Sequence, residues 1–282
     1  MDKEIKANYH MHTNYCDGKN TPEEMVQACI EKKFTHIGFS SHVMYPVGDD
    51  WHISPSKIKD YCETIKKLKE QYKNSISIHL GFEADFLPEV SLPTFENYAE
   101  FSPEYLIGSV HYVFNTEKHH DFQSIKDNAF SVDGPVEELR NGLLKEFNND
   151  GKKLVQTYFA LQREMIKNCN VTIIGHPDVI RKRNGVLHFF DENATWYKQE
   201  LEETAKAIAQ SNAILEINTG GIARGAVNDT YPSLDFLEIL KKYDIRYILS
   251  SDAHAPEHLE SGYQQAATNI QKTGISVVQK LF

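Results

Sequence analysis

The chain has 282 residues, of which 40% are hydrophobic, 25% are charged and 11% are aromatic. This composition excludes wholesale disorder, and no apolar run approaches the ~20 residues that span a bilayer. The net charge of −10 argues against a broad basic surface for duplex nucleic acid, because binding to phosphates needs clustered Lys and Arg.

Strand-like and helix-like segments alternate along the chain. Runs rich in β-branched and aromatic residues predict seven strands, at residues 5–12, 35–42, 76–85, 105–113, 171–176, 213–219 and 247–254. Helical periodicity and capping signals predict helices between them, at residues 22–33, 56–72, 92–101, 151–168, 193–210, 233–243 and 256–273. The alternation favours a parallel sheet covered by helices, and an open, doubly wound sheet would fit as well as a barrel.

Two segments stand out within this pattern. Thr21 is the predicted N-cap of the first helix, with Pro22 at the first helical position and Glu24 completing a capping box. Residues 114–150, after the fourth strand, form the longest irregular stretch. We interpret them as an insertion, which is either a lid over a site or a plain surface excursion.

The placement of the histidines carries the chemistry. His10 and His12 close the first strand, and side chains on a strand alternate between its faces, so both imidazoles point the same way. Alone this pair is weak, because 13 histidines in a chain of this length give about 0.6 such pairs by chance. However, six of the seven predicted strands end in His, Asp or Glu, the residue types that commonly bind metal ions. Asp17 follows the first strand. These residues are His10, His12, His42, Glu83, His111, His176, Asp252 and His254.

The C-terminal ends of parallel strands open onto one face, where α/β barrels build their active sites. Ordinary surface placement gives no reason for imidazoles and carboxylates to gather at that position. The sequence therefore predicts a multinuclear metal site. The other seven histidines lack this placement, and we expect surface or satisfied interior positions for them.

This ordered set resembles the PHP (polymerase and histidinol phosphatase) superfamily of metal-dependent phosphoesterases. The resemblance runs from His10 to His254, and it is strongest toward the histidinol-phosphate phosphatase branch. The segments that carry it are GFEAD at 81–85, GSVHY at 108–112 and GHPD at 175–178. The resemblance implies one domain over residues 1–282, folded as a distorted (β/α)7 TIM-like barrel, with the metal site at the C-terminal strand ends and an insertion at 114–150.

The resemblance also implies three divalent ions. The first would be held by His10, His12, Glu83 and Asp252. Glu83 would bridge to a second ion held by His111 and His176, and Asp17, His42 and His254 would hold the third. Some members have His where this chain has Asp17, and the carboxylate adds negative charge there. Mixed nitrogen and oxygen ligands suit Zn, Fe or Mn, and the sequence does not choose among them.

The implied reaction is the hydrolysis of L-histidinol phosphate to L-histidinol and inorganic phosphate, a step of histidine biosynthesis. We expect a metal-bridging hydroxide to attack phosphorus, with Glu83, Asp252 and Arg224 as the catalytic residues. The leaving-group acid is not assigned. The substrate-binding candidate Asp85 shares strand parity with Glu83.

Arginines follow two of the predicted strands. Arg181 and Arg183 follow the fifth strand, and Arg224 follows the sixth. A guanidinium matches phosphate bidentately, so all three are substrate-binding candidates, although solvated loop positions would explain them equally simply. Arg224 is favoured because glycines flank it and allow close approach to a ligand.

Two other functions fit the same residues. One is a phosphatase of the superfamily that acts on a nucleotide, a sugar phosphate or phosphotyrosine, and the other is a non-catalytic metal-binding module. Met1–Lys6 contains no apolar stretch of the secretory kind, and the four cysteines form no C-x-x-C pair. We therefore expect a soluble, cytoplasmic protein with free thiols. Its expected partner is a small-molecule phosphate ester, without nucleic acid or membrane.

Overall fold

Seven parallel strands form the centre of the computed structural model, which describes residues 5–282. Their order in the sheet follows their order in the chain. They are β1 (Ala7–Asn8), β2 (His36–Phe39), β4 (Ser77–Asp85), β5 (Tyr105–Ser109), β8 (Ile173–Ile174), β9 (Ile214–Asn218) and β10 (Tyr247–Ser250). A short strand, β3 (His42–Val43), follows β2 and also pairs with β4.

The two ends of this sheet meet. A parallel bridge joins Met11 to Ala253, and the Asn8 amide nitrogen lies 2.8 Å from the Ser251 hydroxyl. An open, doubly wound sheet reverses its strand order at a switch point, whereas this order never reverses. The structure therefore confirms the predicted barrel-like alternative: a parallel sheet nearly closed on itself, with helices between the strands.

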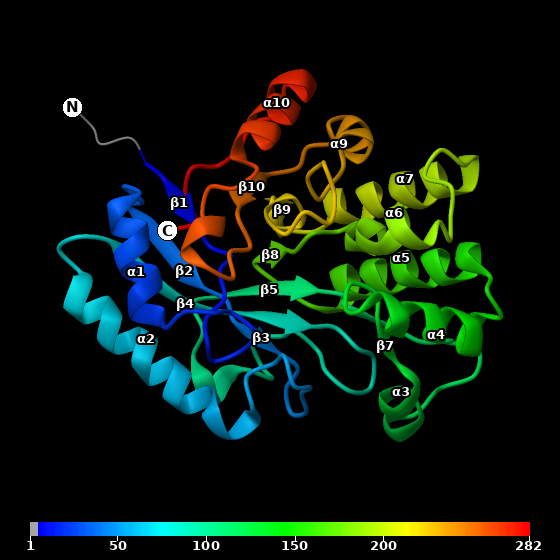
Figure 1. Cartoon of the computed structure of the whole chain (residues 1–282), viewed down its shortest axis with the longest axis horizontal. Coiled ribbons are helices and arrows are strands. Elements are labelled where there is room, and N and C mark those ends of the chain that lie inside the picture. The colour runs from blue at the N-terminus through cyan, green and yellow to red at the C-terminus, as the bar shows by residue number, and fades with distance from the viewer. Residues whose placement is uncertain (1–4) are drawn as a thin grey trace.

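Helices cover the sheet on several sides (Figure 1). Beside β2 and β4 lie α1 (Pro22–Glu31) and α2 (Ile58–Tyr72), and α9 (Leu234–Leu240) and α10 (Tyr263–Thr273) lie near β10. On the right of Figure 1, away from α1 and α2, lie α5 (Gly151–Asn168), α6 (Asn184–Leu187) and α7 (Thr195–Gln210). The predicted capping box at Thr21 and Glu24 is present at the start of α1, where each side chain accepts from the other's backbone N–H.

Amphipathic spacing explains how these helices pack. In α2 the apolar side chains recur at helical intervals and all are buried, namely Ile58, Tyr61, Cys62, Ile65 and Leu68. Burying each of the larger ones contributes roughly 1.5–3 kcal/mol. The opposite face of α2 is rich in Lys and Glu and remains in solvent. The same pattern in α5 fixes the layer that supports β5 and β8.

Residues 114–150 fold back over the C-terminal ends of the strands. The segment contains α3 (Phe122–Asn128), β7 (Phe130–Ser131) and α4 (Val136–Phe147). Strand β7 pairs antiparallel with β6 (Tyr112–Val113), and the Val132 N–H donates to the His111 carbonyl at 2.8 Å. Residues 131–138 are thereby held beside His111.

One predicted helix is wrong. Residues 92–101 form turns, and only the last three make a 3₁₀ helix, η2 (Ala99–Phe101). The Asn97 side chain donates to the Leu92 carbonyl, and the Asn97 N–H donates to the Thr94 hydroxyl. These local bonds occupy groups that a regular helix would pair along the backbone.

Predicted boundaries also shift elsewhere. The 35–42 strand is broken into β2 and β3, and the 256–273 helix is interrupted at Gly262, whose φ is +80°. Only α10 and the 3₁₀ helix η4 (Pro256–His258) remain of that helix. A left-handed backbone favours Gly and ends helical continuity.

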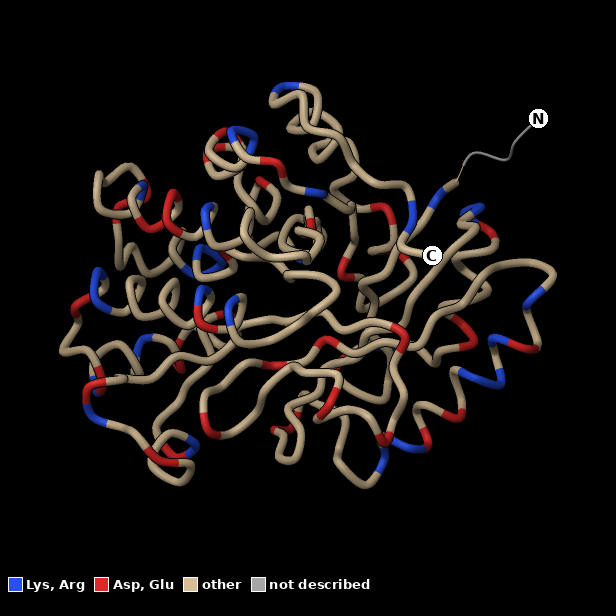
Figure 2. The backbone as a smooth tube through the Cα atoms, turned by 180° about the vertical axis from the view of Figure 1, so that it is seen from behind, with Lys and Arg blue, Asp and Glu red and all other residues tan. Residues whose placement is uncertain are grey.

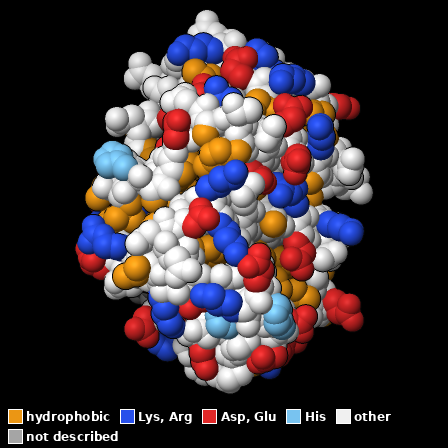
Figure 3. Space-filling model, turned by 90° about the vertical axis from the view of Figure 1, so that its right-hand side faces the viewer, with side chains coloured by type: hydrophobic (Ala, Val, Ile, Leu, Met, Phe, Trp, Pro, Cys, Tyr) orange, Lys and Arg blue, Asp and Glu red, His pale blue; other side chains and the backbone are white. Residues whose placement is uncertain are grey.

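Charges of both signs alternate along the described part of the chain (Figure 2). The side over α4 to α7 likewise shows Lys, Arg, Asp and Glu interspersed, with hydrophobic side chains between them (Figure 3). Within residues 5–282 no helix is both long and apolar enough to cross a membrane. The first four residues of the segment Met1–Lys6, used above for the localisation prediction, lie outside the described residues.

Candidate metal centre

The C-terminal strand ends gather imidazoles and carboxylates into overlapping groups. Within each group the nearest ligand atoms lie within 4.8 Å of one another. The groups are His12–Asp17–His42–His254, His10–His12–Glu83, His10–His176–Asp252, His42–Asp85–His111 and Glu83–His111–His176. The nine predicted ligands thus all lie in one cluster, together with Asp85.

Glu83 lies at the centre of this cluster and is fully buried on β4. The Oε2 atom lies 2.8 Å from His10 Nε2 and 3.1 Å from His42 Nδ1, while Oε1 lies 2.8 Å from His176 Nε2. The parallel register places His42 beside Glu83 on the neighbouring strand. Because its two oxygens face different histidines, Glu83 has the geometry of a carboxylate that bridges two cations.

The electrostatics agree with this position. Burial alone would raise the pKa of Glu83, but the surrounding imidazoles, His10 and His42 first, hold it well below its ordinary value. This lowered pKa favours the anionic form of Glu83, which metal coordination requires. The Ser109 hydroxyl also donates to Oε1 at 2.7 Å, which fixes the carboxylate plane.

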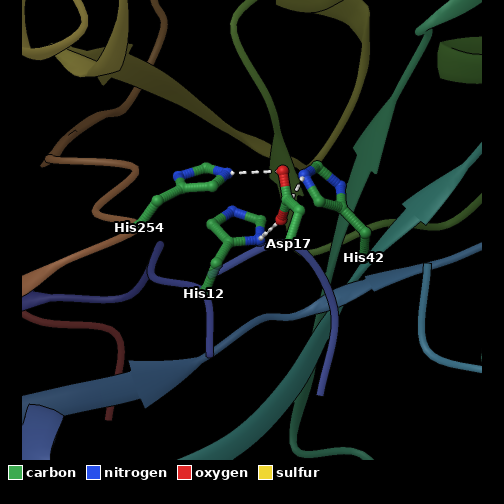
Figure 4. A group of neighbouring side chains, drawn as sticks. All are labelled: His12, Asp17, His42 and His254. Carbon is green, nitrogen blue, oxygen red and sulfur yellow. Dashed lines mark hydrogen bonds and ion pairs between the residues drawn. The ribbon is translucent and has the colours of Figure 1, made fainter. Parts of the chain in front are cut away.

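A second group surrounds Asp17 (Figure 4). Its carboxylate lies between three imidazoles, with Oδ2 3.1 Å from His254 Nε2 and Oδ1 3.8 Å from both His12 Nδ1 and His42 Nε2. The Asp17 loop packs tightly, because a Cβ at Gly18 would lie 2.5 Å from the Thr13 nitrogen. A glycine is required there for the loop to bring Asp17 back over the strand end.

Asp252 and His254 approach from β10. The backbone of Asp252 has a φ of 49°, a left-handed conformation that costs free energy in a non-glycine residue. Its Oδ1 lies 3.2 Å from His12 Nε2 and 3.7 Å from His10 Nε2. The strained backbone of Asp252 thus lies where its carboxylate contacts His10 and His12.

The donor set fits divalent cations. Buried polar atoms normally form hydrogen bonds, yet His12 Nε2 and His42 Nδ1 form none, although carboxylate oxygens lie 3.2 and 3.1 Å away. The His12 ring also lies 4.1 Å, centroid to centroid, from the rings of both His42 and His254. Neutral imidazoles packed around carboxylates suit borderline metals such as zinc. These residues therefore form a site for divalent metal binding.

Two carboxylates orient the histidines from behind. Glu216 on β9 contacts His10 Nδ1 at 2.6 Å and accepts from the His176 N–H at 3.0 Å. The sequence prediction missed Glu216, because the sixth strand ends in no ligand. One sequence signal could have indicated this role: Glu216 and Asn218 lie on the same face of an otherwise apolar strand.

Asp85 is the other orienting carboxylate, and its predicted role in substrate binding needs correction. Its Oδ1 lies 2.8 Å from His111 Nδ1, and its Oδ2 lies 2.8 Å from His52 Nε2. The side chain is fully buried and does not line the cavity. Although burial would raise its pKa, His111 and His52 lower it to about 2. Both oxygens are thus already engaged by protein groups.

Replacing Glu216 with Gln is expected to weaken metal binding about 10- to 100-fold, because the amide no longer holds His10 in its charged hydrogen bond. Isothermal titration calorimetry with the metal ion measures the dissociation constants. Glu104→Gln is the matched control, since Glu104 also contacts a histidine, His79 at 3.0 Å, at the other end of the barrel. Unchanged metal affinity in Glu216→Gln would contradict the orienting role.

A cavity of about 280 Å³ lies above the cluster. Its floor is formed by candidate metal ligands, and its walls come from Trp51, Arg224, Lys182 and residues 131–138. The predicted insertion therefore contributes to the wall of the site. The small volume suits a compact ligand.

The arginines divide into two kinds. Arg224 lines the cavity, where its Nη2 lies 2.8 Å from Asp252 Oδ2 and its Nη1 3.0 Å from His254 Nδ1. Gly220 makes room for it, since a Cβ there would lie 2.8 Å from Arg224 Nη2. Its guanidinium is thus fixed directly beside the proposed metal ligands.

Arg181 and Arg183 do not reach the cavity. Arg181 pairs with Glu192 at 2.7 Å, and Arg183 donates to the Asp133 and Gly134 carbonyls at 2.9 and 2.7 Å. They lie on a 3₁₀ helix, η3 (Val179–Arg183), which turns Lys182 toward the cavity. The predicted phosphate contacts of these two arginines are therefore not supported, and Lys182 was missed.

Cys16 lies beside the cluster but is not poised as a nucleophile. Its Sγ is 3.6 Å from His12 Nδ1 and 3.4 Å from the Thr13 carbonyl. Burial raises the pKa of the thiol to about 11, so it stays protonated near neutral pH.

Comparison with known proteins identifies the fold. A family model described as "PHP domain" matches residues 8–220. A protein of Deinococcus radiodurans named "Probable histidinol-phosphatase" is 25% identical, over 94% of this chain and 92% of its own length.

Two crystal structures are also similar, each at 19% identity. One, a Listeria monocytogenes protein assigned to the histidinol phosphatases, has a TM-score of 0.78 and matches over 92% of this chain and 99% of its own. The other is the histidinol phosphate phosphatase of Lactococcus lactis, complexed with Zn, L-histidinol and phosphate, with a TM-score of 0.64 over 97% of this chain and 95% of its own. At this identity the structures establish the shared fold.

Proposed function

Since the chain belongs to the PHP domain family, we propose that it is a metal-dependent phosphomonoesterase that hydrolyses L-histidinol phosphate to L-histidinol and inorganic phosphate. The observation that carries this proposal is the buried cluster of imidazoles and carboxylates beneath a small cavity with two cationic side chains, Arg224 and Lys182. The relatives named histidinol-phosphatase supply the substrate.

We further propose that the cluster holds three divalent ions. Glu83, His111 and His176 form one group, and Asp17, His42 and His254 belong to another, which also contains His12. The third ion would be held by His10, His12 and Asp252, with Glu83 shared. Zn, Fe and Mn all suit these ligands. Elemental analysis of the purified protein measures the number of ions, and a clear excess or deficit relative to three contradicts the count.

The charge of such a site favours a phosphate dianion. Three dications carry six positive charges, and Asp17, Glu83 and Asp252 remove three of them. When bound, divalent ions activate water for attack and neutralise charge on the phosphoryl oxygens. A net positive pocket walled by Trp51, Arg224, Lys182 and the 131–138 segment therefore attracts a phosphate monoester although the whole chain is acidic.

The chain's own residues position the substrate against this charge. Arg224 is held in the cavity wall by Asp252, which fixes a cation close to where the phosphoryl group would bind. Glu216 and Asp85 hold His10 and His111 in fixed orientations. The 131–138 segment and Trp51 form part of the cavity wall beside the reacting group.

Phosphate release from a panel of esters tests the function. The panel contains histidinol phosphate, a nucleoside monophosphate, a sugar phosphate and phosphotyrosine, each assayed after metal reconstitution. We expect kcat/KM for histidinol phosphate to exceed the others by about 100-fold or more. Equal, low rates on all four esters would contradict the substrate, and no hydrolysis of any would favour a binding module.

Replacing Arg224 with Ala is expected to lower kcat/KM by about 100-fold, because a preorganised cation is lost from the transition state. Steady-state phosphate release measures this effect. Arg140→Ala is the control, since Arg140 pairs with Glu137 on the exposed side of α4. An unchanged kcat/KM in the Arg224 variant would remove this arginine from the site.

A further inference from the structure

The cavity is lined by four carboxylates, of which three contact a basic side chain of the protein. Asp17 lies 3.1 Å from His254, Asp252 lies 2.8 Å from Arg224, and Asp133 lies 2.8 Å from Lys182. Glu138 is the fourth. Among residues 5–282 it has no Lys, Arg or His as an ion-pair partner. Three of the four carboxylates are therefore engaged by an arginine, a lysine or a histidine, and within the described chain Glu138 has none of these partners.

The Glu138 carboxylate is held in place although it lacks a cation. Its Oε1 accepts from the Ser131 N–H at 2.8 Å, and the residue lies in the first turn of α4. Its Oε2 has no hydrogen-bond donor within the described chain. Burial, Asp49 and Asp133 together raise the pKa of Glu138, which shows that its surroundings disfavour the anion. A ligand cation would reverse that penalty.

The insertion gives Glu138 its position. Antiparallel pairing of β6 and β7 carries residues 131–138 back over the strand ends, so Glu138 faces a cavity whose floor is the proposed metal cluster. The indole of Trp51 lies between these regions, edge-on to His42 at 4.6 Å and to His111 at 5.3 Å. The cavity therefore has a cationic floor for an anion and a carboxylate in its wall.

We propose that Glu138 is a specificity-determining residue that binds an ammonium group on the leaving alcohol of the phosphate ester. The inference rests on the proposed function, because histidinol phosphate carries an ammonium on the carbon next to its phosphorylated CH2 group. It adds a selection rule: phosphate monoesters with a cation close to the ester oxygen are preferred over esters of neutral alcohols. Charged hydrogen bonds of this kind discriminate strongly in a small pocket.

Two pairs of substrates isolate the ammonium. The first pair is histidinol phosphate and its deamino analogue, which keeps the imidazole and the phosphate. The second pair is phosphoethanolamine and propyl phosphate, which differ only in replacing ammonium by methyl. In the metal-loaded wild-type enzyme, kcat/KM is expected to favour the ammonium-bearing member by about 10- to 100-fold in each pair. A wild-type ratio near one in both pairs overturns the inference without any variant.

Glu138→Gln tests the residue itself. The amide keeps an oxygen that can accept from Ser131 and removes the charge, so the ratio of kcat/KM between the ammonium-bearing and the neutral ester is expected to fall at least fivefold. Glu137→Gln is the matched control, because Glu137 is exposed in the same helical turn and pairs with Arg140. An unchanged ratio in Glu138→Gln overturns the inference.

The two proposals fail differently. If the wild-type enzyme does not hydrolyse histidinol phosphate but prefers phosphoethanolamine to propyl phosphate, and Glu138→Gln removes that preference, the substrate is wrong and the role of Glu138 stands. If histidinol phosphate is hydrolysed as fast as its deamino analogue, the proposed function stands and the role of Glu138 is wrong.

Discussion

Replacing Glu83 with Gln is expected to reduce phosphate release at least about a thousandfold and to lower the metal content of the protein. Glu83 touches His10, His42 and His176 at 2.8 to 3.1 Å, so its two oxygens are shared between different parts of the cluster. A neutral amide can bridge two cations only poorly, since one end would present N–H groups to a positive charge. Activity and metal loading should therefore fall together.

Elemental analysis and turnover must be measured on the same preparation to test this coupling. Glu104→Gln is the appropriate control, because it also removes the charge of a glutamate beside a histidine, at the opposite end of the barrel. It should retain its metals and its rate. Full metal content and full rate in Glu83→Gln would refute the bridging role.

The clustering of the candidate ligands could be predicted, because it follows from the periodicity of parallel strands. Residues that end successive strands meet on one face whatever the details of the helices between them. His42, Glu83 and His176 lie at such ends, and in the structure both histidines contact the Glu83 carboxylate. Only the residue type and the strand boundary were needed for this inference.

Side-chain direction within the loops could not be predicted in the same way. Arg181, Lys182 and Arg183 are adjacent cations after one strand, and the phase of a short 3₁₀ helix decides that Lys182 faces the cavity. Asp85 has the parity of Glu83, but His111 and His52 occupy both of its oxygens. Parity gives the face of a strand and does not reveal which partners arrive from elsewhere.

Glu138 was hidden for a different reason. It reaches the cavity through the pairing of β6 and β7, two strands of two residues each. Such short strands have no recognisable alternation, so the sequence indicated only an irregular insertion. Glu138, which we propose sets substrate preference, thus lies where local sequence patterns are weakest, on a segment held by long-range contacts.

Removing the metals is expected to abolish activity and to lower the unfolding temperature by about 5–15 °C near pH 7.5. A ligand present at 1,000 times its dissociation constant stabilises the folded state by about 4 kcal/mol, and we propose more than one ion for this site. Dialysis against a strong chelator, followed by thermal unfolding, measures the shift. Adding Zn, Mn or Fe should restore both properties, and equal unfolding temperatures with and without a full complement of metal would contradict the prediction.

The metal-free protein should also respond to pH with a defined sign. Burial disfavours charge on His10 and His111, but Glu216 and Glu83 outweigh it at His10, and Asp85 and Glu83 at His111, so both pKa values lie well above the ordinary 6.5. A raised folded-state pKa gives stability that is fully present below about pH 6.5 and is lost as the pH rises through the folded value. The metal-free protein should therefore unfold at a lower temperature at pH 8.5 than at pH 6.5. Metal binding instead requires neutral imidazoles, so the stabilisation by metal should increase over the same interval. A metal-free protein that is more stable at pH 8.5 than at pH 6.5 would show that protons do not take the place of the cations in this cluster.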